Sequence, residues 1–203
     1  MRAVLTLSAA VAIGLLAPSP GSAATFKANC ATQSLQNRIN AVPAGSVILV
    51  KGTCDPVSID KSITLDGNPT ATIDGNGSDR PVTISGSPTV RLVDLRITGG
   101  KVSAQLANGG GIYHPGGLLV LRRTVVSGNL AEATGVVGPL AQGGGIYSVN
   151  GTIQLFNSSV RSNTARAIGG GGSSAYGGGI IHLGNLLLDH STVSGNRARS
   201  ETA

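Results

Sequence analysis

Residues 109–129 read GGGIYHPGGLLVLRRTVVSGN, and the pattern starts again 34 residues later and once more after a further 34. The later copies end in IQLFNSSVRSN (153–163) and LLLDHSTVSGN (186–196). A fainter relative, VRLVDLRITGG, fills residues 90–100 ahead of them. A repeat of this length indicates an array of similar units, each of which packs on its neighbours.

The pattern inside each repeat separates strands from helices. A period near 34 residues also belongs to tetratricopeptide and ankyrin arrays, but those repeats are helical and need long apolar runs at a spacing of about 3.6 residues. Here apolar and polar residues alternate, and Gly, Asn, Ser and Thr lie between the apolar runs. Such alternation is typical of short strands joined by turns. The sequence therefore predicts an all-β solenoid in which each repeat forms one coil.

Composition agrees with many short strands and tight turns. Gly accounts for 31 of 203 residues, whereas only 12% of residues are charged and 2% are aromatic. A helical bundle or a dinucleotide-binding enzyme would carry more Glu, Lys and Leu. The hydrophobic share of 40% is enough to build a core. The formal net charge of +6 would suit an acidic partner, and it would equally suit a soluble surface with no particular partner.

The register of the repeats predicts the core. Parallel strands stack about 4.8 Å apart, so aligned apolar residues become continuous ladders. The three predicted ladders are Leu92, Leu121, Leu155 and Leu188; Ile97, Val126, Val160 and Val193; and Ile112, Ile146 and Ile180. Three asparagines, Asn129, Asn163 and Asn196, align at a turn. We expect their backbone to be left-handed and their amides to bond the copies above and below.

The segments between and before the repeats are less regular. We expect the inserts 131–142 and 165–176 to be small, flexible loops that project from one face. The upstream segments VILV (47–50), VSIDKSITLDG (57–67), ATIDGNG (71–77) and PVTISG (81–86) are interpreted as earlier coils. With them the solenoid has about six coils.

The two ends of the solenoid are predicted to differ. Residues Ser34 to Ala41 have helical spacing of Leu35, Ile39 and Val42, and we expect a short N-terminal capping helix there, because a solenoid needs its open end covered. The C-terminal RARSETA offers no comparable cap. The last coil is then expected to present an open, apolar end through which copies could associate end to end. That end consists of Ile180, Leu186, Leu188 and Val193.

The first 24 residues are predicted to be a signal peptide. Arg2 supplies a positive charge, and the apolar stretch that follows, residues 3–17, is shorter than the roughly 20 residues of a membrane span. Ser22-Ala23-Ala24 supplies the small residues of a cleavage site. Residues 25–203 would then form one β-helix domain, secreted or held at the cell surface, with no transmembrane segment.

The two cysteines, Cys30 and Cys54, fit an oxidising destination. A disulfide between them would tie down the capping helix, and the loop it closes gives an entropic stabilisation of about 3 kcal/mol. Two free, buried thiols are the alternative.

At this point the residues resemble a known family. The GGGIY…LxL…SxVxxN pattern is similar to repeats of secreted bacterial right-handed parallel β-helix proteins of the pectin-lyase-like superfamily. The opening LQNRINAVPAGSVILVKGTC (35–54) also resembles the entry to such helices. The polymorphic outer-membrane proteins have similar repeats, of whose Phe-x-x-Asn signature only the fragment at Phe156 is present. The resemblance implies the fold but no single function, because the superfamily contains lyases, hydrolases, epimerases and adhesins.

No catalytic, cofactor or metal site is predicted. A hydrolase needs two carboxylates that converge within about 5–9.5 Å, and the regular coils contain only Glu132 and Asp189, at different positions of different coils. Residues 74–79, DGNGSD, lack the glycine that a calcium loop needs at its sixth position, and we interpret them as a turn. The three histidines, His114, His182 and His190, are interpreted as solvent-facing turn residues.

Six residues are candidate ligand contacts. Tyr113 and Tyr147 align on adjacent coils and could stack into a small platform for a sugar ring. Four arginines make the C-terminal half basic, which suits an acidic polysaccharide or a cell-wall polymer; a solvated face is the alternative. These are Arg122, Arg123, Arg161 and Arg166. Arg166 should also pair with Glu132 on the neighbouring coil, worth about 0–1 kcal/mol. Specific nucleic-acid binding is not expected, because stacking aromatics are nearly absent.

The sequence is compatible with two functions. The first is an exported, non-catalytic β-helix module with a structural or adhesive role, in contact with a surface, wall or glycan. The alternative is a carbohydrate-active enzyme, a polysaccharide lyase or glycoside hydrolase, with its site in the irregular N-terminal coils. A cluster of carboxylates with Arg or Lys on one outer face would favour the enzyme, and the register does not show one.

Overall fold

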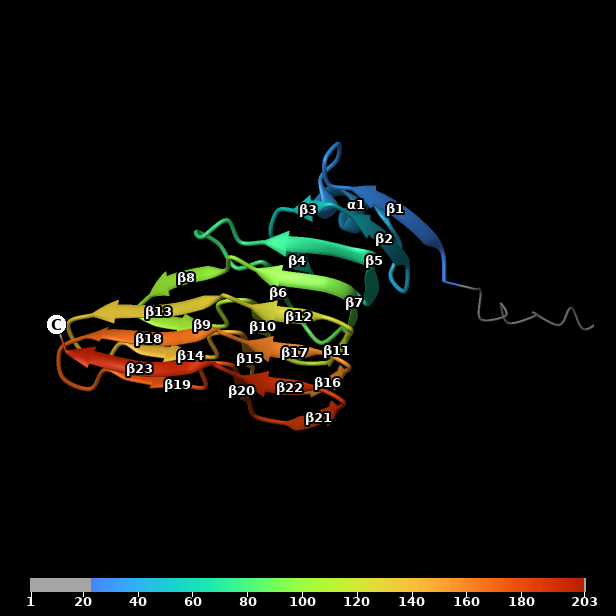
Figure 1. The fold of residues 1–203 in the computed structure, drawn as a ribbon. Coiled ribbons are helices and arrows are strands. Elements are labelled where there is room, and N and C mark those ends of the chain that lie inside the picture. Colours follow the sequence, from blue (N-terminus) through green and yellow to red (C-terminus); the bar gives the residue numbers. More distant parts are fainter. Residues whose placement is uncertain (1–22, 203) are drawn as a thin grey trace, which may run out of the picture.

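The computed structural model describes residues 23–202, which fold as a parallel β-solenoid with one short helix (Figure 1). Every strand pairing among these residues is parallel. The predicted fold class is thus confirmed. The predicted signal peptide, residues 1–24, lies outside the described residues apart from its last two, and it stays a prediction. No helix within residues 23–202 has the length and apolar character needed to cross a membrane.

The described strands stack into four sheets, which we name A to D. Sheet A has eleven strands: β1 (Thr25–Asn29), β2 (Val47–Lys51), β3 (Thr53–Cys54), β5 (Ile63–Asp74), β7 (Thr89–Thr98), β11 (Leu118–Arg122), β12 (Val125–Ser127), β16 (Thr152–Phe156), β17 (Ser159–Arg161), β21 (Asn185–Asp189) and β22 (Thr192–Ser194). Sheet B has five: β4 (Val57–Ile59), β6 (Val82–Ile84), β10 (Ile112–His114), β15 (Ile146–Ser148) and β20 (Ile180–His182). Sheet C has four: β8 (Lys101–Ala104), β13 (Leu130–Gly135), β18 (Thr164–Gly169) and β23 (Arg197–Thr202). Sheet D has three: β9 (Leu106–Asn108), β14 (Leu140–Gln142) and β19 (Ser174–Tyr176).

The number of coils differs from the prediction. Sheets C and D begin only at β8 and β9, so the solenoid has about four complete turns and not about six. The earlier strands stack on sheets A and B but do not complete the circuit through C and D.

The three predicted apolar ladders are confirmed and fill the space between sheets A and B, which we call the body. Leu92, Leu121, Leu155 and Leu188 pair in register, and the first three are fully buried. Toward the N-terminal strands, the ladder continues through Leu65 and Ile48. The body is therefore one continuous core of Leu, Ile and Val from the N-terminal strands to the last coil.

The two inserts are strands and not flexible loops, which corrects the prediction. Residues 131–142 and 165–176 lie in β13 and β14 and in β18 and β19, whose sheets C and D face each other across a second, smaller core. We call this two-sheet lobe the arm; it is the left-hand part of the molecule in Figure 1. Its core consists of Ala107, Ala131, Ala133, Ala141, Ala165 and Ala167, all fully buried. Small residues indicated flexibility in the sequence, but as alternate residues they let two sheets approach closely.

The GGG triplet of each repeat forms the corner at which the arm meets the body. A Cβ atom on Gly111 would lie 2.7 Å from the carbonyl oxygen of Gly145, and one on Gly145 would lie 2.7 Å from that of Gly179. Side-chain carbons do not approach a backbone this closely, so the stacked corner requires glycine. The most visible motif of the sequence is therefore a packing requirement.

The predicted asparagine ladder is confirmed, although its backbone conformation is not as expected. The Nδ2 group of Asn129 donates to Oδ1 of Asn163 at 2.9 Å, and that of Asn163 donates to Oδ1 of Asn196 at 3.0 Å. The left-handed residue is the one before each asparagine, Gly128, Ser162 and Gly195. The amides thus bond along the stack while their neighbours make the turn.

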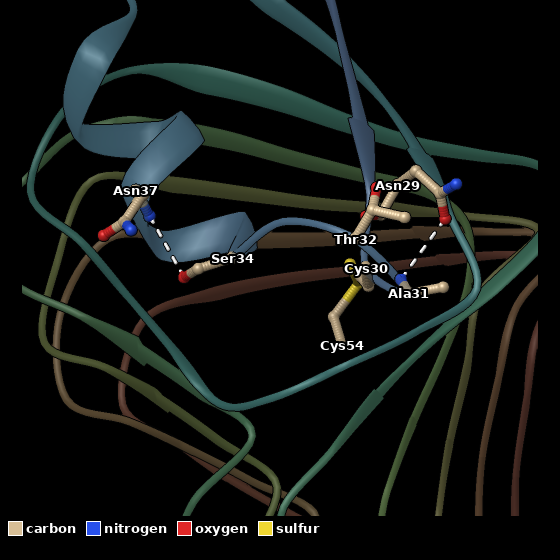
Figure 2. Close-up of a disulfide and its surroundings, with 7 residues drawn as sticks. All are labelled: Asn29, Cys30, Ala31, Thr32, Ser34, Asn37 and Cys54. Carbon is tan, nitrogen blue, oxygen red and sulfur yellow. Dashed lines mark hydrogen bonds between the residues drawn. A yellow bond between two sulfur atoms is a disulfide. The ribbon is translucent and has the colours of Figure 1, made fainter.

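The N-terminal end is covered as predicted. Helix α1 (Leu35–Ala41) begins after Ser34, whose hydroxyl accepts a hydrogen bond from the backbone N–H of Asn37 at 3.3 Å. Leu35, Ile39 and Val42 are buried against the first strands. The predicted disulfide is confirmed: Cys30 and Cys54 are bonded, beside the turn that leads into the helix (Figure 2).

The last described coil is open. Leu186, Leu188 and Val193 are each 44% exposed, whereas their counterparts one coil earlier are fully buried. Ile180 is partly buried against the core. This agrees with the apolar end expected from the sequence.

Candidate functional site

The outer face of sheet B carries a column of side chains that point away from the core. The parallel register aligns one residue from each strand: Ser58, Thr83, Tyr113, Tyr147 and Ile181. Their neighbours in each strand point inward, because side chains alternate across a sheet. The column therefore changes from hydroxyl groups near the N-terminal end to aromatic rings in the middle.

The two predicted tyrosines are stacked. The ring centroids of Tyr113 and Tyr147 lie 5.7 Å apart, with an angle of 12° between the ring planes. The guanidinium of Arg80, from the preceding coil, lies 5.0 Å from the centroid of Tyr113. The stack thus covers the faces of the Tyr113 ring, and a ligand approaching from outside meets ring edges and hydroxyl groups. We call Arg80, Thr83, Tyr113 and Tyr147 the tyrosine surface.

Arg80 connects the body to the arm. Its Nε donates to the carbonyl oxygen of Gly109 at 2.7 Å, its Nη2 donates to that of Asn108 at 2.7 Å, and its Nη1 donates to Oγ1 of Thr83 at 3.3 Å. None of the ion pairs in the described part of the chain includes Arg80. Burial accordingly lowers the pKa of its guanidinium below the ordinary value. Neutral acceptors make all of its hydrogen bonds, and the carboxylate of Asp79 in the same cleft interacts with it only electrostatically.

A polar cleft of about 480 Å³ lies beside the tyrosine surface, where the arm begins. Its lining residues come from β4 and the residue before it, from the turn before β6, from β6 itself and from β8: Pro56, Val57, Ser58, Ser78, Asp79, Arg80, Thr83, Lys101, Val102 and Ser103. Arg80 and Thr83 belong both to the cleft and to the tyrosine surface. The sequence did not indicate this site, because its residues are spread from Pro56 to Ser103, 47 positions apart, and share no repeat position.

The four predicted arginines do not converge. Arg122 lies on the outer face of sheet A, over the ring of Phe156 at 5.5 Å. Arg161 is an exposed residue at the end of β17. Arg166 lies on sheet C, in the arm. The structure thus brings together only the two tyrosines among the six candidates, and their contact with a ligand stays a prediction.

Arg123 is bound to a carboxylate. It occupies a left-handed corner between β11 and β12, and its Nε and Nη2 donate to the two carboxylate oxygens of Asp94, each at 2.6 Å. These hydrogen bonds hold the pKa of Asp94 below its ordinary value. The bidentate contact occupies this guanidinium.

Arg166 lies in a row of alternating charges on the outer face of sheet C. It pairs with Glu132 at 3.5 Å, as the register predicted, and more closely with Glu201 at 2.5 Å. Glu132 pairs in turn with Lys101 on β8 at 3.2 Å. This row of ion pairs thus runs Glu201, Arg166, Glu132, Lys101 and ends at the cleft. At both ends it runs diagonally to the strand register, in which Arg166 faces Arg199 and Glu132 faces Ser103.

One histidine lies in the core, which corrects the prediction that all three face solvent. His114 is fully buried, and its Nδ1 lies 2.9 Å from Oγ of Ser148 on the next coil. Burial lowers its pKa from 6.5 to about 4. His114 ends β10 one residue after Tyr113, so alternation turns its ring inward. His182 is half-buried at the same register position, and only His190 is exposed.

Residues 23–202 contain no group of three or more His, Cys, Asp or Glu side chains that could hold a metal ion. The chain matches no protein-family model, no curated protein and no solved structure. The geometry of the tyrosine surface and of the cleft is therefore the basis for any functional conclusion.

Proposed function

We propose that the protein is an exported, non-catalytic β-helix module that contacts a glycan or cell-wall polymer through the tyrosine surface. The observation that carries this proposal is the continuous stack of Arg80, Tyr113 and Tyr147 on an outer face of the solenoid. The stack holds one cation and two phenol groups in fixed positions, and such groups bond the hydroxyl and carboxylate groups of a polysaccharide.

The stacked geometry makes the test specific. If a sugar ring lay on the tyrosine faces, replacing Tyr by Phe would be tolerated, because the ring face is kept. We expect instead that the hydroxyl groups make the contact, so that Tyr113→Phe and Tyr147→Phe each weaken binding by about twofold to tenfold. Tyr176→Phe is the matched control, because Tyr176 is 53% exposed on sheet D and lies outside the stack.

The measurement is binding of purified residues 25–203 to a panel of acidic and neutral polysaccharides by affinity electrophoresis. Retardation by one polysaccharide class, reduced in both stack variants and unchanged in the control, supports the proposal. Absence of retardation by every polysaccharide, or equal retardation of all four proteins, contradicts it.

A carbohydrate-active enzyme is the second proposal, and the cleft favours it. Asp79, Arg80 and Lys101 line one cavity, and a polysaccharide lyase needs cations of this kind beside the bond that it breaks. Incubation with the same polysaccharides and calcium, followed by mass spectrometry, detects released oligosaccharides. If oligosaccharides are released and the release is lost in Asp79→Asn or Lys101→Gln, the protein is an enzyme and the proposal of a non-catalytic module is wrong.

Export and family membership are proposed from the disulfide and from the fold, and no single site carries them. The disulfide is compatible with an oxidising compartment, which supports secretion or display at the cell surface. The parallel solenoid supports the resemblance to pectin-lyase-like and polymorphic outer-membrane repeats. A reporter enzyme fused after residue 24 would test export, which is contradicted if the reporter stays inside the cell.

End-to-end association of copies also stays a proposal. It is supported by the exposed Leu186, Leu188 and Val193 of the last described coil. Sedimentation velocity over a range of concentrations tests it. Leu188→Glu should shift the distribution toward the monomer, and a monomer at all concentrations contradicts the association.

A further inference from the structure

The arm begins with an unpaired strand edge. Sheet C runs in the order β23, β18, β13, β8, so β8 pairs on one side only. Figure 1 shows β8 at the margin of the arm nearest the N-terminal strands, with the strands of the body continuing past it. The body thus rises beside the arm, and β8 borders the corner between them. The polar cleft occupies this corner, because it is lined by Lys101, Val102 and Ser103 of β8 and by residues of β4 and β6.

The unpaired side of β8 presents backbone groups to the cleft. The carbonyl oxygen of Gly100 accepts from Leu130 on the β13 side, whereas the N–H of Lys101 donates to Asp79 on the opposite side, at 3.0 Å. The backbone N–H and C=O groups of successive strand residues point to opposite sides of the strand. Those of Ser103, two residues after Lys101, therefore point away from β13 as those of Lys101 do. None of the described residues bonds to the N–H or carbonyl of Ser103 or to the carbonyl of Lys101 on that side.

The usual protection of a strand edge is weak here. Natural edges are blunted by proline, by bulges or by a lysine that overhangs the edge. The strand sequence KVSA contains no proline, and its pairing with β13 has no irregularity. The ammonium of Lys101 pairs with Glu132 on the outer face of sheet C, so it does not cover the backbone groups of the edge. The edge is thus open to another extended backbone.

The ladders of the arm define which side chains an added strand must carry. Facing the interior, Val102 stacks on Ala131 and Ala165, and Ala104 stacks on Ala133 and Ala167. An added strand therefore needs small residues at its inward positions, because the core between sheets C and D consists of alanine side chains with Val102 and Ala175 packed against them.

The outer face defines the charge of the added strand. The row Glu201, Arg166, Glu132 and Lys101 alternates in sign and ends at Lys101, whose side chain is 39% exposed. Beyond Lys101 the cleft holds Arg80, which forms no ion pair within residues 23–202, and Asp79, whose carboxylate interacts with Arg80 only electrostatically. A carboxylate at an outward position of the added strand would continue the alternation.

We propose that the β8 edge is a docking site for an extended segment of a partner protein, in which small inward residues alternate with acidic outward residues. The segment would add a strand to sheet C, with its backbone bonded to Ser103 and its acidic side chain beside Lys101.

The probe is the synthetic peptide acetyl-Ala-Glu-Ala-Asp-Ala-Glu-amide. It is added at about millimolar concentration to purified, 15N-labelled protein of residues 25–203, and amide hydrogen exchange is followed by NMR. Peptides that add a strand bind through the backbone, so the Ser103 amide should become protected from hydrogen exchange. A peptide with Lys at the acidic positions should bind more weakly. A peptide N-methylated at alternate residues, which cannot form the ladder, should not protect the amide.

Two substitutions at one position test the backbone contact. Ser103→Pro removes the N–H that points to the cleft and breaks no bond to β13, and edge strands tolerate proline. We expect Ser103→Pro to lower the affinity for the acidic peptide by about twofold to tenfold, which corresponds to the loss of one hydrogen bond. Ser103→Ala should bind the peptide as the unmodified protein does. Melting temperatures of both variants establish that they are folded. Lys101→Gln should abolish the preference for the acidic peptide over the lysine peptide.

The proposal is overturned if the acidic peptide leaves the Ser103 amide unprotected, or if Ser103→Pro binds it as Ser103→Ala does. It is also overturned if an oligosaccharide of uronic acids, and not the peptide, protects that amide, because the cleft would then be a glycan site. These results leave the proposed function of the tyrosine surface untouched, since its Tyr→Phe variants are measured separately.

Discussion

The body and the arm of this solenoid are built from the same parallel ladders but are filled with side chains of different size. In the body, each coil contributes Leu, Ile or Val to a common core. In the arm, each coil contributes alanine, and sheets C and D lie close together. The comparison shows that side-chain volume, and not hydrogen-bond pattern, sets the distance between the walls of the solenoid.

The difference in size is also a difference in energy. Burying a Val, Leu or Ile side chain is worth about 1.5–3 kcal/mol, and an alanine contributes only a fraction of this. The arm therefore depends on backbone hydrogen bonds between coils and on its glycine corner with the body. We expect the body to carry most of the free energy of unfolding, and the following substitutions test this.

The largest effect is expected in the body. Leu155→Ala removes a fully buried ladder residue and leaves a cavity, so the free energy of unfolding should fall by about 2–5 kcal/mol. Leu188 lies in the same ladder one coil later, where its side chain is 44% exposed. Leu188→Ala should therefore lower the free energy of unfolding clearly less than Leu155→Ala does. Urea unfolding followed by circular dichroism measures both. Equal losses would mean that the ladder is not the core of the protein.

Acid should weaken the body before it weakens the arm. The pKa of His114 falls from 6.5 to about 4 on folding, so the unfolded chain binds more protons between these values and stability decreases as the pH falls through this range. With about 1.4 kcal/mol for each pKa unit, the full loss approaches 3 kcal/mol at about pH 4. The pKa of Glu201 in the arm is lowered from 4.5 by Arg166, so its contribution is present above pH 4.5 and is lost only below it.

Melting temperatures at several pH values check this order. His114→Gln should remove most of the slope between pH 6.5 and 4, because it removes the group whose pKa is lowered by burial. A slope unchanged by His114→Gln would show that another group is responsible.

Overpacking should destabilise the arm, the reverse of the change that damages the body. Ala167→Leu places a large side chain between sheets C and D and should cost about 1–3 kcal/mol. Ala104→Leu is the matched control, because Ala104 stacks in the same ladder but is exposed at the β8 edge. Proteolysis or hydrogen exchange locates the loss in the arm. If both variants were equally stable, the alanine core would not be tightly packed.

The smallest effect is expected on the outer face of the arm. Glu132→Gln interrupts the row of charges between Lys101 and Arg166, and pairs of this kind are worth about 0–1 kcal/mol. The difference from the unmodified protein should shrink further at high salt. A loss well above 1 kcal/mol that is insensitive to salt would assign Glu132 a buried role.

The ladders, the capping helix and the disulfide could be predicted from the sequence, whereas the predictions for the inserts and for His114 were wrong. The ladders are local: each residue repeats at a fixed distance, and alternation decides which side is buried. The inserts have the same alternation, but alanine is too weakly hydrophobic to mark an inward face. His114 lies one residue after Tyr113, and the same alternation indicates its burial once the tyrosine is known to point outward.

The candidate site was found only in part, for a different reason. Tyr113 and Tyr147 share a repeat position, so their stacking follows from the period. Arg80 lies on an irregular turn before β6, and nothing in the repeat indicates that it covers Tyr113 or bonds the carbonyl oxygens of Asn108 and Gly109. The cleft likewise depends on where sheet C begins.

The period and alternation of residues 90–196 were sufficient to establish a parallel solenoid, its three apolar ladders and its asparagine ladder, because in a stacked coil the neighbour of each residue is its own repeat. The arm, the corner cleft and the open edge of β8 required the tertiary structure. They arise where successive coils differ, since the early coils pass from sheet A to sheet B without the detour through sheets C and D. Repetition encodes contacts between equivalent residues, and a site formed by non-equivalent residues becomes visible only when the coils are placed in space.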